Sequence, residues 1–110
     1  MKVTFSMDAL MDFTMLPKNQ QKIITRMIGR LMSNPQSKNK GGYGIPLGHK
    51  GKNNLTGLLE GKLRGEGLRI IYTLDKEDKM EIKAIGVRED EEIYDVVAKR
   101  IGGINSKEIP

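Results

Sequence analysis

Residues 58–74 of this chain, LLEGKLRGEGLRIIYTL, predict a β-hairpin on which the rest of the fold depends. Gly65-Glu66 at its centre suits a two-residue type II′ turn, which needs glycine in its first central position. That turn sets Lys62 opposite Arg69, because the register of a hairpin follows from the turn that closes it. The stretch therefore predicts both which residues pair and which side chains share a face.

Alternation along the two strands divides their side chains into two sets, because neighbours along a strand point to opposite faces of the sheet. One set is apolar and is expected to pack on helices: Leu59, Gly61, Leu63, Leu68, Ile70, Tyr72 and Leu74. The other set is mostly charged and is expected to form a cationic face: Glu60, Lys62, Arg64, Arg69 and Ile71.

The cationic face opposes folding unless something neutralises it. Like charges directly opposite each other, as Lys62 and Arg69 would be, cost a few tenths of a kcal/mol up to about 1 kcal/mol. A phosphate bridging them would explain the arrangement, because guanidinium and ammonium groups match phosphate oxygens. The alternative is that Glu60 neutralises part of the cluster as an ordinary surface pair.

Two helices are predicted near the N-terminus, after a short strand at Val3–Phe5. Ser6 can cap the first helix, and Pro17 separates it from a second helix over residues 18–32. Apolar residues recur at three- and four-residue spacing and are expected to face the core: Ala9, Leu10, Phe13, Leu16, Ile23, Ile24, Met27, Ile28 and Leu31. The two helices together predict a helical hairpin.

Residues 33–54 show no usable periodicity and predict a long loop rich in glycine and lysine. A P-loop is rejected for this segment, because the lysine-threonine ending of that motif is missing. Tyr43 is expected to anchor the loop on the sheet and His49 to be an exposed loop residue, although either could contact RNA. Lys50 and Lys52 are predicted to bind RNA as part of the basic middle of the chain.

A further strand from Met80 and a C-terminal helix complete the predicted fold. Gly86 indicates a bulge or a close approach of the backbone, which would aim Arg88 at the end of the strand. The helix is expected to bury one stripe: Ile93, Val97 and Ile101. Tyr94 lies beside that stripe and reads either as a packing tyrosine or as a functional one.

Composition and charge limit the classes of function. The 110 residues carry a net charge of +5, and residues 38–69 contribute seven basic and two acidic side chains. This segment is either the footprint of a polyanion or a surface kept for solubility. With no cysteine, one histidine and no apolar run of about 20 residues, we expect one cytoplasmic domain over residues 1–110 with no metal, no cofactor and no membrane contact.

The chain resembles the RelE/ParE superfamily of bacterial toxins from toxin–antitoxin pairs, and its RelE branch in particular. The resemblance lies in the order and spacing of five fragments: Leu55-Thr56-Gly57, Lys62-Leu63-Arg64, Gly67–Tyr72, Ile85–Glu89 and Ile93-Tyr94. It implies an α+β fold: a small twisted, mainly antiparallel β-sheet packed on an N-terminal helical hairpin, with a C-terminal helix.

RelE-like members cut messenger RNA in the ribosomal A site, so the resemblance implies a metal-independent endoribonuclease. Four residues match positions used for cleavage: Lys62, Arg69, Arg88 and Tyr94. Arg64 matches a basic position beside them. A further basic position, usually lysine, is Glu60 here, which makes Glu60 a modulator or an alternative base. The implied partners are a cognate antitoxin protein, mRNA and ribosomal RNA.

RNA cleavage of this kind uses the neighbouring 2′-hydroxyl as nucleophile, so the protein must orient it, stabilise the transition-state charge and manage protons. Lys62 and Arg69 suit charge stabilisation, while Tyr94 is a candidate base or a platform for a nucleobase. Two other interpretations stay open: a non-enzymatic ParE-like gyrase inhibitor, and a catalytically inactive relative that binds RNA or antitoxin, which Glu60 motivates.

Overall fold

A computed structural model describes residues 2–63, 65, 67–77, 79–87 and 92–107, with only the backbone described for 102–107. The elements in chain order are β1 (Val3–Phe5), α1 (Met7–Thr14), α2 (Lys18–Ser33), the 3-10 turn η1 (Lys38–Lys40), β2 (Ile45–Lys50), β3 (Asn53–Leu63), β4 (Leu68–Leu74), β5 (Met80–Val87) and α3 (Glu92–Lys107). The strands form one sheet in the order β1-β5-β4-β3-β2. β1 runs parallel to β5, and the other neighbours are antiparallel.

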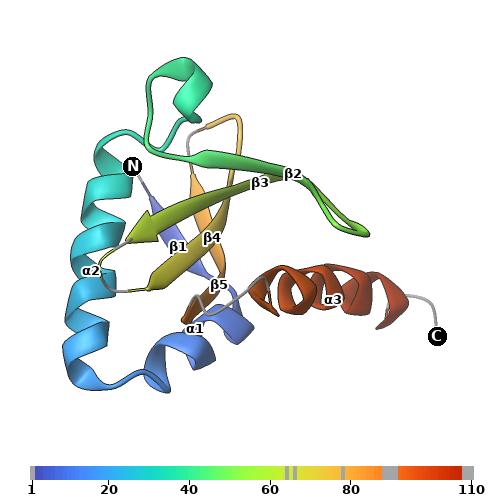
Figure 1. Ribbon diagram of the computed structural model, residues 1–110, viewed down its shortest axis with the longest axis horizontal. Coiled ribbons are helices and arrows are strands. Elements are labelled where there is room, and N and C mark those ends of the chain that lie inside the picture. The colour runs from blue at the N-terminus through green and yellow to red at the C-terminus, as the bar shows by residue number, and fades with distance from the viewer. Residues whose placement is uncertain (1, 64, 66, 78, 88–91, 108–110) are drawn as a thin grey trace.

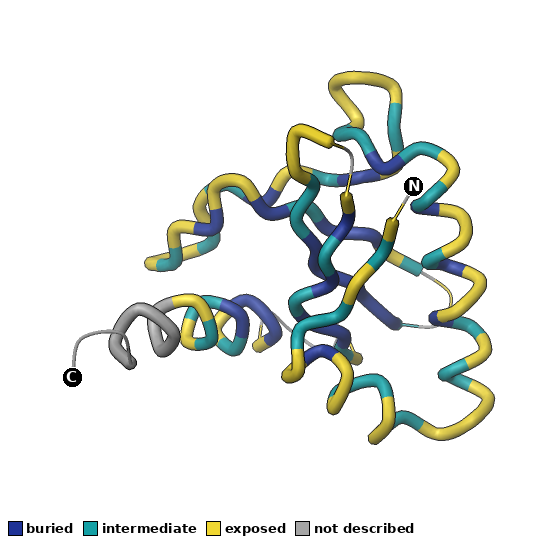
Figure 2. Tube along the Cα trace, turned by 180° about the vertical axis from the view of Figure 1, so that it is seen from behind, coloured by how far each residue is buried: buried dark blue, intermediate teal, exposed yellow. Residues whose placement is uncertain are grey.

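The helices cover the sheet on both faces, with α1 and α2 on one and α3 on the other (Figure 1). Buried residues concentrate along the central strands, and the outward sides of the helices are exposed (Figure 2). The predicted α+β architecture is therefore confirmed. None of the described helices has the length and apolar character needed to cross a membrane.

The N-terminal hairpin forms as its capping residues predict. The Ser6 hydroxyl accepts a hydrogen bond from the Ala9 amide at 3.1 Å, which satisfies one of the unpaired donors at the start of α1. The Gln21 side chain donates to the carbonyls of Phe13 and Leu16, both at 3.1 Å, and so ties α2 to the end of α1. Leu10 was predicted to face the core and is instead 44% exposed, because it falls on the outer side of α1.

The larger core lies between the hairpin and the predicted apolar face of β3 and β4. Its buried members are Ala9, Ile24, Met27, Leu31, Leu68, Ile70, Tyr72, Met80, Ile82 and Ile85. Gly61 allows α2 to approach β3 closely, since a Cβ there would lie 2.8 Å from Leu31 Cδ1 and 3.3 Å from Met27 Cε. The apolar half of the hairpin prediction is thus confirmed.

The opposite face is not the open cationic surface that the strand pattern predicted. A second core covers much of it, with α3 packed over the sheet: Leu47, Leu55, Leu58, Ile71, Ala84, Ile93, Tyr94 and Val97. The Arg100 guanidinium also binds Asp12 of α1 through two contacts of 2.8 Å. The predicted inner stripe of α3 holds at Ile93 and Val97, whereas Ile101 is 38% exposed.

The prediction of a long loop over residues 33–54 is wrong, because this segment contains η1, β2 and the start of β3. Gly48 has a left-handed backbone (φ 57°), and the β2–β3 register shifts between Pro46 and Gly48. This irregularity breaks the two-residue alternation by which a strand is recognised. His49 is exposed, as predicted, but it lies on β2 and not in a loop, and it pairs with Asn54 of β3.

The register predicted for the central hairpin is confirmed, with Lys62 paired to Arg69. At the turn of this hairpin, Gly67 has a left-handed backbone (φ 64°). Glu66, the second central residue of the predicted type II′ turn, lies outside the described residues. Gly86 provides the predicted close approach rather than a bulge, since a Cβ there would meet Ile93 of α3 at 3.0 Å. The register shift opposite β4 falls earlier, next to Tyr72.

Tyr72 gives a first prediction about stability. Its hydroxyl donates to the Pro35 carbonyl at 2.8 Å, and the residue is fully buried. Tyr72→Phe leaves that carbonyl unpaired and should lower the free energy of unfolding by about 1–3 kcal/mol in urea titration. Tyr43→Phe is the matched control, because Tyr43 is half-exposed and should change stability by less than about 0.5 kcal/mol.

The same residue predicts a pH dependence. Burial raises the pKa of Tyr72 to about 12, against 10.0 ordinarily. Its stabilising contribution is therefore complete below about pH 10 and is lost between about pH 10 and 12, a change of about 2–3 kcal/mol. Urea titrations at several pH values should show the gap between wild type and Tyr72→Phe shrinking over that range, and a constant gap would contradict this assignment.

Candidate active site

Three polar side chains from separate elements meet between the sheet and α3: Glu60 of β3, Arg69 of β4 and Tyr94 of α3. Arg69 Nη1 donates to Tyr94 Oη at 2.5 Å and lies 3.2 Å from Glu60 Oε2. Tyr94 Oη donates to the Glu60 carboxylate, 3.0 Å from Oε1 and 3.2 Å from Oε2. The residues are 1%, 4% and 3% exposed, so the cluster is part of the interior.

Strand register and helix packing create this cluster. Lys62 pairs with Arg69 and Glu60 with Ile71, so Glu60 is the diagonal neighbour of Arg69 on the same face, within reach of a long side chain. Tyr94 lies in the first turn of α3. The neighbouring Ile93 packs against Gly86 of β5, which holds this turn close to the sheet.

The electrostatics of the cluster differ from the predicted row of cations. Glu60 compensates the charge of Arg69 inside the protein, where an unpaired charge would be strongly unfavourable. Glu60 therefore does neutralise part of the cationic cluster, but the interpretation of this pair as a surface pair is wrong, because both side chains are buried. Arg69 Nε is also buried and has no hydrogen-bond partner among the described residues.

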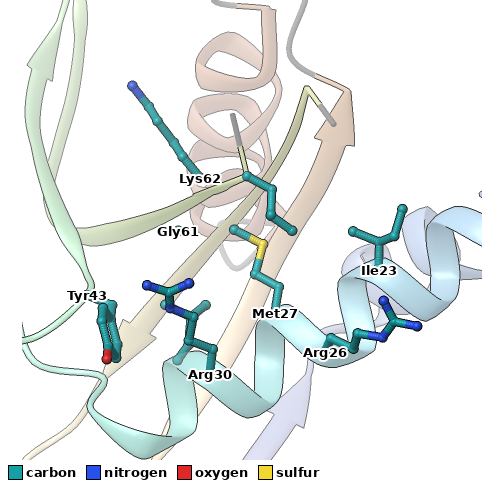
Figure 3. A pocket seen from close by; sticks show the side chains of 9 residues that line it. Ile23, Arg26, Met27, Arg30, Tyr43, Gly61 and Lys62 are labelled. Carbon is teal, nitrogen blue, oxygen red and sulfur yellow. The ribbon is translucent and has the colours of Figure 1, made fainter. Parts of the chain in front are cut away.

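Lys62 lies beside this cluster but remains in solvent. It pairs with Arg69 across the strands and is exposed. Figure 3 shows its side chain extending away from α2, toward the α3 side of the sheet. No described carboxylate forms an ion pair with it, so its ammonium group is available to an anion.

The two lysines predicted to bind RNA lie at a cleft of about 400 Å³ whose lining includes Tyr94. Lys50 Nζ is 5.4 Å from the centroid of the Tyr94 ring, which places a cation over its π face. Lys52 belongs to the turn between β2 and β3 and lines the same cleft. The structure thus brings both lysines to the predicted tyrosine.

The cleft also contains residues that the sequence did not single out. Asn53 Nδ2 donates to Asp95 Oδ1 at 2.7 Å, joining the β2–β3 turn to α3, and Glu92 lies on the rim. Polar residues 42 positions apart carry no local signal of their contact. The predicted residues Arg64 and Arg88 lie outside the described residues.

No metal site is evident in the part of the chain that the structure describes, where no three histidine or carboxylate side chains are grouped closely enough to hold an ion. The polar groups at the site are one buried carboxylate–guanidinium pair, a phenol, three lysines and, in the cleft, two further carboxylates and an amide. Such groups can bind phosphate and move protons.

The sheet order, the helical hairpin and the single helix on the opposite face define a RelE-like fold. The E. coli RelE toxin superposes with a TM-score of 0.63 at 20% identity, over 91% of this chain and 97% of that one. A chain of a RelBE toxin–antitoxin complex from Mycobacterium tuberculosis gives 0.61 at 22% identity, over 81% and 92%. A chain of the intact E. coli RelBE complex gives 0.58 at 18% identity, over 81% and 98%.

These likenesses are likenesses of fold, because the sequences have diverged to about one identical residue in five. No protein-family model matches the sequence. No curated protein is significantly similar to it in sequence.

Glu60→Gln should be strongly destabilising, because it leaves the buried Arg69 charge uncompensated. Removing one partner of a buried ion pair costs about 3–5 kcal/mol. The matched control is Glu81→Gln, which removes a partly exposed pair with Lys83 at 2.6 Å and should cost no more than about 1 kcal/mol. Urea unfolding of both variants measures the difference, and equal losses would show that the Glu60 pair contributes no more than a surface pair.

Proposed function

We propose that this protein is the toxin of a toxin–antitoxin pair and that it cleaves messenger RNA in the ribosomal A site. The observation that carries the proposal is the meeting of Arg69 and Tyr94 beside Lys62. These are the described members of the set that the RelE resemblance assigns to cleavage. The fold likeness to the E. coli RelE toxin over 91% of the chain supports the same function.

In the proposed reaction, the 2′-hydroxyl oxygen attacks the adjacent phosphorus, the bond to the 5′-oxygen breaks, and the leaving 5′-oxygen takes a proton from solvent water. The products are a 2′,3′-cyclic phosphate and a free 5′-hydroxyl. Tyr94 Oη would take the 2′-hydroxyl proton while its own proton passes to the Glu60 carboxylate, with which it is already hydrogen-bonded. Because Tyr94 is buried, this step requires α3 to move far enough for the 2′-hydroxyl to reach Oη. No metal is needed for this step, because the nucleophile belongs to the substrate.

Cationic side chains near Tyr94 would stabilise the negative charge of the transition state. Lys62 is exposed next to Arg69 and can approach a phosphorane oxygen directly. Arg69 donates to Tyr94 Oη and thereby orients the phenol. Arg88, which we assign to the same site from its resemblance, would stabilise charge or act near the leaving 5′-oxygen.

The RNA would approach from the cleft beside Tyr94. Lys50 and Lys52 line that cleft and can bind phosphates on either side of the cleaved bond. Arg64 is assigned to the same role. The ribosome, a cognate antitoxin protein and a cytoplasmic location complete the proposal, and RelE-like neighbours in complexes with antitoxin support such a partner.

Purified protein added to a translating extract should produce discrete mRNA breaks, mapped by primer extension. Tyr94→Phe and Lys62→Ala should each lower the cleavage rate at least about 100-fold, the usual scale for loss of an acid–base or charge-stabilising group. Lys76→Ala is the matched control for Lys62→Ala, because Lys76 is exposed in the β4–β5 turn far from the site, and should leave the rate unchanged.

Other outcomes would contradict the proposal. Intact mRNA together with DNA double-strand breaks in cells would indicate a gyrase inhibitor. Intact mRNA with retained antitoxin binding would indicate a relative in which the Glu60–Arg69 pair has silenced cleavage. Circular dichroism of every variant separates loss of activity from loss of folding.

A further inference from the structure

The outer edge of β5 has a strand partner over only part of its length. β1 pairs with β5 from Met80 to Ile82, and among the described residues no other strand lies on that side of β5. The β4–β5 register shifts between Ile82 and Ala84, which leaves Lys83 as the extra residue of a bulge. The Lys83 carbonyl and the Ile85 amide therefore need partners other than a strand.

Side chains from two helices supply those partners. The Ile85 amide donates to Asp12 Oδ2 of α1 at 3.0 Å. Arg100 Nη1 of α3 donates to the Lys83 carbonyl at 2.9 Å, and the two terminal nitrogens of Arg100 each bind one oxygen of Asp12 at 2.8 Å. Two parallel contacts of this kind make a strong and well-oriented ion pair. The Asp12–Arg100 pair thus joins α3 to α1 and to β5 at one end of the sheet (Figure 1).

The other contacts of α3 with the sheet are few. Among the residues of α3 whose side chains are described, the buried ones are Ile93, Tyr94 and Val97, and the hydrogen bond from Asn53 to Asp95 is exposed. Cavities lie on both sides of the helix: the cleft of about 400 Å³ beside Tyr94, and a second of about 240 Å³ between β5 and α3. A helix with few buried contacts opens at a lower cost in free energy than global unfolding.

Tyr94 is out of reach of RNA while α3 lies in this position. The residue is 3% exposed, and its hydroxyl forms hydrogen bonds with Glu60 and Arg69 of the sheet. A 2′-hydroxyl must come within about 3 Å of Oη before a proton can pass. The contacts that hold α3 down therefore set the fraction of molecules in which Tyr94 is accessible.

We propose that α3 is a gate over Tyr94 and that the Asp12–Arg100 pair keeps the gate closed. Breaking the pair lets α3 move away from the sheet and exposes the phenol. Asp12 and Arg100 are then positioning residues, since they act through α3 and touch no substrate. Their effect on RNA cleavage rests on the proposed function, whereas the opening of α3 can be measured without RNA.

The pair is placed to control α3 without supporting the two cores. The Asp12 and Arg100 side chains are 20% and 22% exposed, and neither residue belongs to an apolar cluster. When the pair breaks, water can reach both groups, so no buried charge is left uncompensated, in contrast with the Glu60–Arg69 pair. Loss of the Asp12–Arg100 pair is therefore expected to release α3 and to leave the rest of the fold intact.

The first test measures access to Tyr94 by nitration with tetranitromethane, followed by mass spectrometry of peptides. Two other tyrosines calibrate the reaction, because Tyr43 is 44% exposed and Tyr72 is fully buried. Asp12→Asn preserves an acceptor for the Ile85 amide and removes the negative charge of the pair. It should speed nitration of Tyr94 at least about fivefold, as expected when a minor open state becomes more populated, and leave Tyr72 unreactive.

Asp8→Asn is the matched control. It removes the same charge from the same helix, at a carboxylate 3.9 Å from Arg100 Nε, which is too long for a hydrogen bond, and should change nitration of Tyr94 less than about twofold. Arg100→Met breaks the pair from its other end and should match Asp12→Asn. Unchanged nitration of Tyr94 in both pair variants would overturn the proposal. Nitration of Tyr72 in parallel would also overturn it, since the whole fold would then have loosened.

RNA cleavage tests the gate as part of the reaction. Asp12→Asn should raise the rate of mRNA cleavage about two- to tenfold, because the accessible fraction of Tyr94 rises. A lower rate with intact folding would mean that the pair only supports the active arrangement, and would overturn the gate. If the wild type cuts no RNA while Asp12→Asn still exposes Tyr94 to nitration, the gate stands and the proposed function fails.

A reversible lock makes the opposite change. The chain contains no cysteine, so Asp12→Cys/Arg100→Cys introduces the only two thiols, which a short bis-methanethiosulfonate reagent can join. Joining them should lower the cleavage rate at least about tenfold, because α3 can no longer move away, and dithiothreitol should restore the rate. Cleavage that continues undiminished in the joined protein would overturn the proposal.

Discussion

The buried contact among Glu60, Arg69 and Tyr94 links two strands and the C-terminal helix, and the site depends on it. Burying the Arg69 guanidinium would be strongly unfavourable without the Glu60 carboxylate. The Tyr94 hydroxyl forms hydrogen bonds with both groups. Since α3 supplies the phenol, the helix and the charge pair hold each other in place. Any chemistry at Tyr94 is therefore coupled to how α3 sits on the sheet.

The sheet separates two kinds of packing. Its hairpin face is apolar, and Gly61 brings α2 close to β3. Its α3 face combines a smaller apolar core with the charged cluster, and Arg100 fastens α3 to Asp12 of α1. The two faces of the sheet therefore differ in kind, because aliphatic contacts with the helical hairpin close one face and α3, with a buried charged cluster beneath it, closes the other.

Much of the fold could be predicted because strand alternation, helix spacing and capping are local. Ser6, Pro17 and the pairing of Lys62 with Arg69 all follow from residues close in sequence. β2 escaped prediction because the irregularity at Gly48 hides its alternation. The environment of Arg69 also escaped prediction, because strand pattern assigns a face but does not say whether a distant helix covers that face.

The sequence by itself determined the hairpin register, the apolar face, the N-terminal helices and the set of residues that the RelE resemblance singles out. Tertiary structure alone decided that Glu60 meets Arg69 and Tyr94 in the interior and that Lys50 lies over the Tyr94 ring. It also decided that Gly61 of β3 lies against Leu31 and Met27 of α2. These outcomes depend on long-range packing, in which residues tens of positions apart share one environment, and such contacts leave no periodic trace in a single chain.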